Sequence, residues 1–199
     1  MNTDSCTQWQ RAPLPWLSTE QCHWLFLPGS LTLHLKALGQ YRLELIDQYP
    51  TQACVADAQA LGIAAGTPLW VRTVLMRLDQ RPCVLARSIA PLGALDQGWA
   101  VLDGYGSQPL GMMLYQDPDI VRGPFEWGVL ALDEPLGRLS RCLDDSGPWL
   151  ARRSLFHRHG APLLIAECFL SGFWHHEGRA PSPAARPLAR PAGALTQHL

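Results

Sequence analysis

Hydrophobic residues are concentrated in several short segments of the chain that are bounded by polar turn residues, a pattern typical of β-strands. Leu69–Leu78 and Cys83–Ala90 are two such segments, separated only by a short polar turn. Trp149–His159 and Leu163–Leu170 repeat this arrangement around a turn that contains Gly160. Because short turns join antiparallel strands, the pattern predicts two long β-hairpins.

Shorter segments complete the predicted fold. Tyr41–Ile46 and Phe125–Leu132 are expected to be strands. Thr19–Phe26 is expected to be a helix with Thr19 as its cap, and Leu31–Leu38 a second helix capped by Ser30. Hairpins beside separate helices predict an α+β fold in which the helices pack on a single antiparallel β-sheet.

The composition divides the chain into three parts. Residues 1–18 are expected to be an irregular N-terminal segment, and residues 19–174 a domain. Residues 175–199 are rich in proline and alanine and offer almost nothing for a core, which predicts a disordered tail. With 199 residues, of which 47% are hydrophobic, the chain is long enough for a domain with a substantial core.

Charge and cysteine usage narrow the possible partners. The net charge is −1 and no basic block is present, so we expect neither nucleic acid nor an anionic membrane surface as a partner. The six cysteines are scattered without CxxC pairs, and the first residues do not resemble a secretory signal. These features predict a cytoplasmic protein with free thiols, and we expect it to be a monomer.

Glu167 stands where a carboxylate is unusual. In the strand Leu163–Leu170 it shares one face with Leu163, Ile165 and Phe169, and the opposite face is apolar as well. A buried carboxylate costs several kcal/mol unless it is paired, hydrogen-bonded or protonated. We therefore expect a compensating group, and a bound ligand is one candidate.

Arg72 is the second unexpected charge, because it lies on the face of its strand that carries Trp70, Val74 and Met76. Arginine keeps its charge when buried, so it needs an anionic partner or a path to water. One interpretation is a buried ion pair between Arg72 and Glu167, or an Arg72 that reaches water at a strand end. The other is that both residues line one cavity and bind opposite ends of an anionic ligand.

Other charged residues give weaker signals. His157 and His159 alternate on a strand, but no third ligand at a telling spacing supports a metal site. Gly104-Tyr105-Gly106 lacks the strand-turn-helix context of a dinucleotide site. Four arginines are interpreted as solvated or rim charges: Arg138, Arg141, Arg152 and Arg153.

The order of several short motifs resembles the chorismate lyase family. Each motif is unspecific alone, but their joint order and spacing are fairly specific over residues 20–172. The motifs are Gly29-Ser30-Leu31-Thr32, Leu69-Trp70-Val71-Arg72, Ala86-Arg87-Ser88-Ile89-Ala90-Pro91, Pro109-Leu110-Gly111, Trp149 to Ser154 with two arginines, and Pro162 to Leu170. The stretch from Gln52 to Gly66 departs from the family, which leaves one cavity wall undefined.

The resemblance implies a fold, a site and a reaction. Members have one antiparallel sheet with flap-like helical segments over an internal ligand cavity. They convert chorismate to 4-hydroxybenzoate and pyruvate for ubiquinone biosynthesis, without metal or organic cofactor. By resemblance, Arg72 would hold the ring carboxylate and Glu167 the ring hydroxyl, as catalytic residues. Leu110 would contribute a backbone contact, and Leu31 an apolar contact, to substrate binding.

A binding module is the rival interpretation. Ligand-sensing domains of GntR-type transcription regulators resemble the lyase fold and bind small effectors without chemistry. They usually follow a winged-helix DNA-binding domain, and the roughly 20 residues before the first predicted helix leave no room for one. This favours the enzyme, although the product could also be a related aromatic such as 3-hydroxybenzoate.

Overall fold

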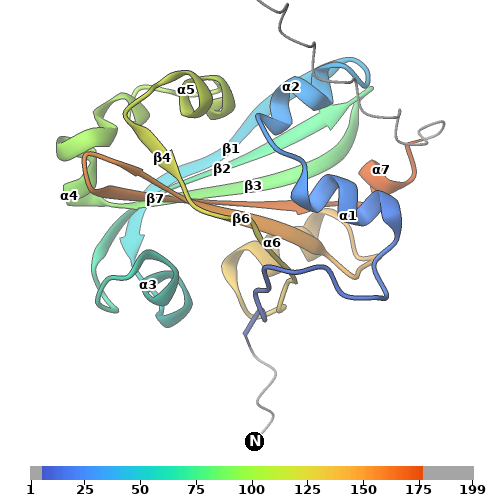
Figure 1. The fold of residues 1–199 in the computed structure, drawn as a ribbon, viewed down its shortest axis with the longest axis horizontal. Helices are drawn as coiled ribbons and strands as arrows, with labels where there is room; N and C mark the ends of the chain where they lie inside the picture. Colours follow the sequence, from blue (N-terminus) through green and yellow to red (C-terminus); the bar gives the residue numbers. More distant parts are fainter. Residues whose placement is uncertain (1–5, 177–199) are drawn as a thin grey trace, which may run out of the picture.

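The fold is built on one antiparallel sheet, seen nearly edge-on in Figure 1. The computed structural model describes residues 6–176. Within them, seven strands are ordered β1-β2-β3-β7-β6-β4, and β5 also pairs with β6. The strands are β1 (Tyr41–Gln52), β2 (Pro68–Leu78), β3 (Arg81–Pro91), β4 (Ile120–Arg122), β5 (Glu126–Val129), β6 (Leu150–Arg158) and β7 (Ala161–Phe169).

Helices cover both faces of this sheet. On one face, α3 and α6 pack against side chains of β2, β3 and β7. The other helices lie on the opposite face: in Figure 1, α2 and α5 are above the sheet, α1 and α7 are at its right-hand end and α4 is at its left-hand end. The helices are α1 (Thr19–Phe26), α2 (Leu31–Lys36), α3 (Val55–Leu61), α4 (Leu92–Ala94), η1 (Leu95–Trp99), η2 (Ala100–Leu102), α5 (Leu110–Gln116), α6 (Pro135–Leu143) and α7 (Ser171–Trp174).

The α+β class and both long hairpins are confirmed. β2 and β3 turn at Asp79-Gln80, where Leu78 pairs with Arg81, and β6 and β7 turn at His159-Gly160, where Arg158 pairs with Ala161. Asp79, Gln80 and His159 adopt positive φ, as does Gly160. Such backbone suits two-residue hairpin turns, because it matches the twist of the flanking strands.

Several boundaries differ from the prediction. Ser18, not Thr19, caps α1, because its hydroxyl accepts from Gln21 N–H while the Gln21 side chain accepts from Ser18 N–H. Ser30 holds the N-cap position of α2, but its hydroxyl makes no capping bond. The strand expected at Phe125–Leu132 is limited to Glu126–Val129, where it pairs with β6.

Residues 6–17 contain no helix or strand, yet they are anchored to the domain. Gln10 exchanges two backbone hydrogen bonds with Trp127 of β5, both 2.8 Å long. Thr7 donates to both carboxylate oxygens of Glu134 through its N–H and hydroxyl. The tail predicted at 175–199 lies almost entirely outside the described residues. Within those residues, no helix combines the length and apolarity needed to span a membrane.

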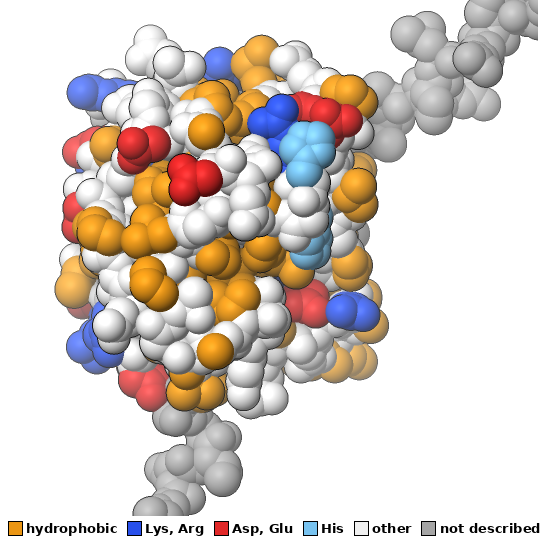
Figure 2. All heavy atoms as spheres, turned by 90° about the vertical axis from the view of Figure 1, so that its left-hand side faces the viewer, with side chains coloured by type: hydrophobic (Ala, Val, Ile, Leu, Met, Phe, Trp, Pro, Cys, Tyr) orange, Lys and Arg blue, Asp and Glu red, His pale blue; other side chains and the backbone are white. Residues whose placement is uncertain are grey.

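The surface beside α4 and α5 is largely apolar. Figure 2 faces this side and shows hydrophobic side chains gathered across it, with charged side chains of both signs scattered around them. The exposed hydrophobic residues of these segments include Leu92, Val101, Met112 and Tyr115.

Candidate active site

A cavity lies between the sheet and the helices α2 and α5. About 590 Å³ of empty space lies between its walls, and part of that space is open to solvent. Most of its wall is apolar, and the only charged side chains lining it within residues 6–176 are Arg72, Arg152 and Glu167.

Strand register places the polar wall residues in two neighbouring rows. Across the sheet, Arg72 is opposite Ser88, Ser88 is opposite Ile165, and Ile165 is opposite Ser154. The next row runs through Ala86, Glu167 and Arg152. Because neighbouring strands lie about 4.8 Å apart, β2 and β7 are separated by about 10 Å. Arg72 and Glu167 therefore face one cavity with room between them.

Arg72 is only 2% exposed and has no carboxylate partner within residues 6–176. Its Nε and Nη2 donate to the carbonyl oxygen of Gly106 at 3.1 and 2.7 Å, and Nη2 also donates to that of Gln108 at 2.8 Å. These bonds fix the loop that leads into α5. Burial lowers the pKa of the Arg72 guanidinium, while Tyr105 and Tyr41 raise it. Nη1 makes no hydrogen bond with the described residues and remains available to a ligand.

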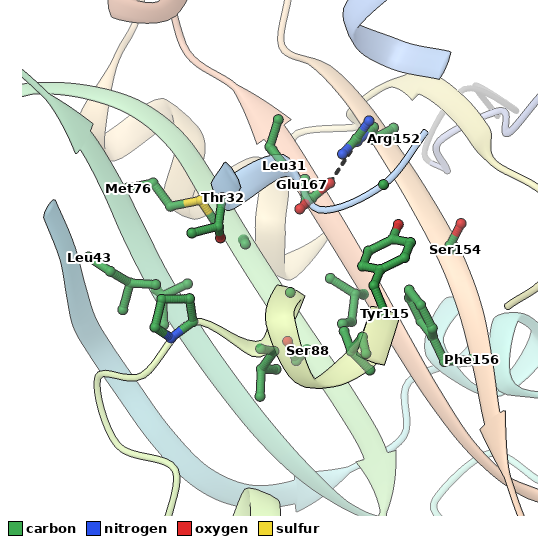
Figure 3. Close-up of a pocket in the computed structure, with 18 of the residues that line it drawn as sticks. Leu31, Thr32, Leu43, Met76, Ser88, Tyr115, Arg152, Ser154, Phe156 and Glu167 are labelled. Atoms are coloured by element: carbon green, nitrogen blue, oxygen red, sulfur yellow. Dashed lines mark hydrogen bonds and ion pairs between the residues drawn. The ribbon is translucent and has the colours of Figure 1, made fainter. Parts of the chain in front are cut away.

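Glu167 pairs with Arg152 and not with Arg72. Arg152 Nε donates to Glu167 Oε2 at 2.6 Å, and Arg152 Nη1 donates to the carbonyl oxygens of Trp24 and Leu27, both at 3.0 Å. The Glu167 side chain is only 16% exposed, and Arg152 is the compensating group that a buried carboxylate requires. The exposure arises because Glu167 faces the cavity (Figure 3). Its Oε1 makes no hydrogen bond within residues 6–176.

Two short helices cover the cavity like flaps. Leu31, the first residue of α2, and Leu110, the first residue of α5, both line it and are 3% and 6% exposed. The N–H of a first helical residue has no acceptor in its own helix, so Leu110 can offer a backbone donor. Gly111 lies against Ser30 so closely that a Cβ there would collide with the Ser30 hydroxyl. The flaps are therefore closed on each other.

Aromatic residues complete the end of the cavity near Glu167. Phe125 packs against Arg152, whose guanidinium carbon is 4.5 Å from the ring centroid. Tyr115 of α5 is 41% exposed, at the border between cavity and solvent. In Figure 3 its hydroxyl is directed towards the side where Glu167 and Arg152 lie.

The structure brings all four residues selected from sequence, Arg72, Glu167, Leu31 and Leu110, to one cavity. The sequence analysis missed Arg152, which it interpreted as a solvated or rim charge; the residue is in fact 2% exposed. Two signals could have identified it. Arg152 alternates with Leu150 and Ser154 on the inward face of β6, and a two-residue turn at His159-Gly160 places it directly opposite Glu167.

The segment 52–66, which departs from the family motifs, does not form a cavity wall. It contains α3, whose Ala58 and Leu61 pack on the other face of the sheet. There Asp57 binds Arg87 of β3 through two hydrogen bonds of 2.8 and 2.9 Å. The departure therefore leaves the cavity lining unaffected.

Fold and site together define an α+β domain with a cavity between its sheet and two short covering helices. The protein belongs to the chorismate lyase family, whose model, described as Chorismate lyase, matches residues 4–179. This membership confirms the resemblance drawn from the short motifs.

The chain is similar in sequence to curated relatives over nearly their full lengths. The chain is 54% identical to the probable chorismate pyruvate-lyase 1 of Burkholderia pseudomallei (strain 1710b), over 87% of this chain and 94% of the relative. It is 50% identical to the probable chorismate pyruvate-lyase 1 of Pseudomonas entomophila (strain L48), over 83% and 90%.

Among solved structures, the C-terminal domain of PhnF superposes with a TM-score of 0.53 at 18% identity. The match covers 72% of this chain and 89% of that domain. At this identity the likeness supports the fold alone.

Proposed function

We propose that this protein is a chorismate pyruvate-lyase, which converts chorismate to 4-hydroxybenzoate and pyruvate in ubiquinone biosynthesis. The observation that carries the proposal is that Arg72 and Glu167, two strands apart, line one mostly apolar cavity. Chorismate has a ring carboxylate and a ring hydroxyl at opposite ends of its ring. Arg72 and Glu167 lie on strands about 10 Å apart, so the guanidinium can bind the ring carboxylate while the glutamate contacts the ring hydroxyl.

In this proposal Arg72 binds the ring carboxylate through Nη1, while its other donors stay on the carbonyl oxygens of Gly106 and Gln108. Those bonds orient the guanidinium before the substrate arrives. A charge-assisted hydrogen bond is strong in a site from which water is excluded. Leu31 and the backbone N–H of Leu110 complete substrate binding from the flaps.

Glu167 contacts the ring hydroxyl and handles the proton. The reaction breaks the ether bond between the ring and the enolpyruvyl oxygen, and the electron pair leaves with that oxygen. The ring carbon that bears the hydroxyl loses one proton, the enolpyruvyl methylene gains one, and the ring becomes aromatic. Arg152 holds Oε2, so Oε1 is the oxygen free to receive and return the proton.

The flaps exclude water, and their tight closure gives the first mutational prediction. Gly111→Ala would push its new methyl group against Ser30, and such overpacking costs about 1–3 kcal/mol. We expect the dissociation constant for 4-hydroxybenzoate to rise by about 5- to 100-fold, measured by calorimetry. Adding Ser30→Ala should restore part of the affinity, because it removes the hydroxyl in the way.

Gly93→Ala is the matched control, because a Cβ at Gly93 meets no atom within 4 Å. It should bind 4-hydroxybenzoate as the wild type does. Unchanged affinity in Gly111→Ala would mean that the contact between α2 and α5 does not govern ligand retention.

The direct test is to incubate the purified protein with chorismate and separate the products by chromatography. We expect 4-hydroxybenzoate and pyruvate in equal amounts, at a rate proportional to protein concentration. Formation of 3-hydroxybenzoate would assign a sister reaction to the same cavity. Binding of chorismate without turnover would instead favour an effector-binding module.

We further propose that the protein acts as a cytoplasmic monomer without a nucleic-acid partner. All six cysteines are free, which suits a reducing compartment. The net charge of −1 gives no basis for phosphate binding. Light scattering during gel filtration should return the mass of one chain.

A further inference from the structure

Arg122 is the one other arginine whose charge is unexplained. Within residues 6–176, every arginine that is not exposed has a carboxylate within 4.0 Å, except Arg72 and Arg122. A partly buried cation without a counter-ion is unfavourable, so an anion is expected beside it when the protein works. Arg72 has an anion in the proposed function, whereas Arg122 has none.

Arg122, the last residue of strand β4, does not line the cavity itself but contacts three residues that do. Its Nε donates to the hydroxyl of Ser154 at 3.1 Å, and its guanidinium carbon is 3.3 Å from the ring centroid of Phe125 and 5.8 Å from that of Tyr115. Ser154, Phe125 and Tyr115 all line the cavity. Both Nη groups of Arg122 make no hydrogen bond within the described residues, so they remain free to bind an anion.

Shared packing on Phe125 places Arg122 near Arg152, at the Glu167 end of the cavity. Burial lowers the pKa of the Arg122 guanidinium, Tyr115 raises it, Arg152 lowers it and Glu167 raises it. Phe125 lies against both Arg122 and Arg152, with ring-centroid distances of 3.3 and 4.5 Å, whereas Arg72 is on β2, two strands away from Glu167. The two arginines without a counter-ion therefore mark opposite ends of one site.

Chorismate carries a second carboxylate that Arg72 cannot reach. Its enolpyruvyl ether is attached to the ring carbon next to the one bearing the hydroxyl. If Glu167 contacts the hydroxyl, the enolpyruvyl carboxylate also lies at the Glu167 end. Arg152 is already neutralised there by Glu167. The site therefore has three positive charges, on Arg72, Arg122 and Arg152, and one negative charge, on Glu167. The excess of two positive charges matches the two carboxylates of chorismate.

We propose that Arg122 binds the enolpyruvyl carboxylate of the substrate and so distinguishes chorismate from 4-hydroxybenzoate. The inference rests on the proposed function, since it uses the same cavity. Phe125 and Ser154 orient the guanidinium, while both Nη groups contact the carboxylate. The contact exists only before cleavage, because the product lacks this carboxylate and pyruvate leaves with it.

The test compares two ligands in Arg122→Gln. The KM for chorismate should rise by about 10- to 100-fold, as expected for loss of a hydrogen-bonded charge contact. The dissociation constant for 4-hydroxybenzoate should stay within about twofold of wild type, because that ligand has no enolpyruvyl group. Retained product binding also demonstrates a folded cavity. Arg122→Lys, which keeps the charge but loses the planar fork, should give an intermediate KM.

Arg158→Gln is the matched control, since Arg158 pairs with Asp117 away from the cavity. Its KM for chorismate should remain unchanged. An unchanged KM in Arg122→Gln, or equal weakening of chorismate and 4-hydroxybenzoate, would overturn the assignment of Arg122. Failure of the wild type to form 4-hydroxybenzoate is a different result, visible before any variant is made, and would reject the proposed function together with this inference.

Discussion

Arg72→Ala is expected to lower kcat/KM for chorismate by about 30-fold to several thousand-fold. Removing one partner of a buried, hydrogen-bonded charge pair costs about 2–5 kcal/mol, and the ring carboxylate would lose its cation. Arg72 also holds the carbonyl oxygens of Gly106 and Gln108, so the loop before α5 should loosen. Steady-state kinetics and calorimetry should show weaker binding of chorismate and 4-hydroxybenzoate alike, because both carry this carboxylate.

Two variants separate charge loss from unfolding. Arg72→Lys keeps the positive charge but cannot bridge a carboxylate and two carbonyl oxygens at once, so its activity should lie between those of wild type and Arg72→Ala. Arg77→Ala removes an arginine from the same strand that pairs with the partly exposed Glu44, and activity should be retained. Full activity in Arg72→Ala would remove this arginine from the site.

Glu167→Gln is expected to lower kcat by about 10²- to 10⁴-fold, the usual contribution of general acid–base catalysis. Glutamine has the same shape and can still bond to a hydroxyl, but it cannot accept the ring proton. The affinity for 4-hydroxybenzoate should therefore change much less than kcat. Single-turnover measurements would locate the defect in the chemical step. A kcat close to that of the wild type would exclude Glu167 as the proton carrier.

The same substitution should also destabilise the fold, because Arg152 is 2% exposed and would lose its counter-ion. Breaking a buried pair from one side costs about 3–5 kcal/mol. Adding Arg152→Met removes the stranded charge, so the double variant should recover part of the lost thermal stability. It should recover no activity. This split would separate the structural role of the pair from the catalytic role of Glu167.

Local patterns were sufficient to predict the long strands of both hairpins and the residues on each of their faces. Alternation placed Arg72 with Val74, and Glu167 with Ile165, on faces that the structure shows to line the cavity. Turn residues located both hairpins to within a few positions, because strand period and turn backbone depend on neighbouring residues. β4 was missed, since its three residues, Ile120–Arg122, are too few to establish a period. α6 was also missed, although Pro135 begins it in a favourable position.

The sequence by itself determined the fold class, the family resemblance and the two charged residues that do not fit an apolar strand. The tertiary structure alone decided which partner each charge has. Arg152 lies opposite Glu167 in only one strand register. The carbonyl oxygens that accept from Arg72 belong to a loop 34 and 36 residues further along the chain. Arg122 donates to Ser154, which is 32 residues away in the sequence. Such contacts depend on how distant segments pack, and residue periodicity carries no information about that distance.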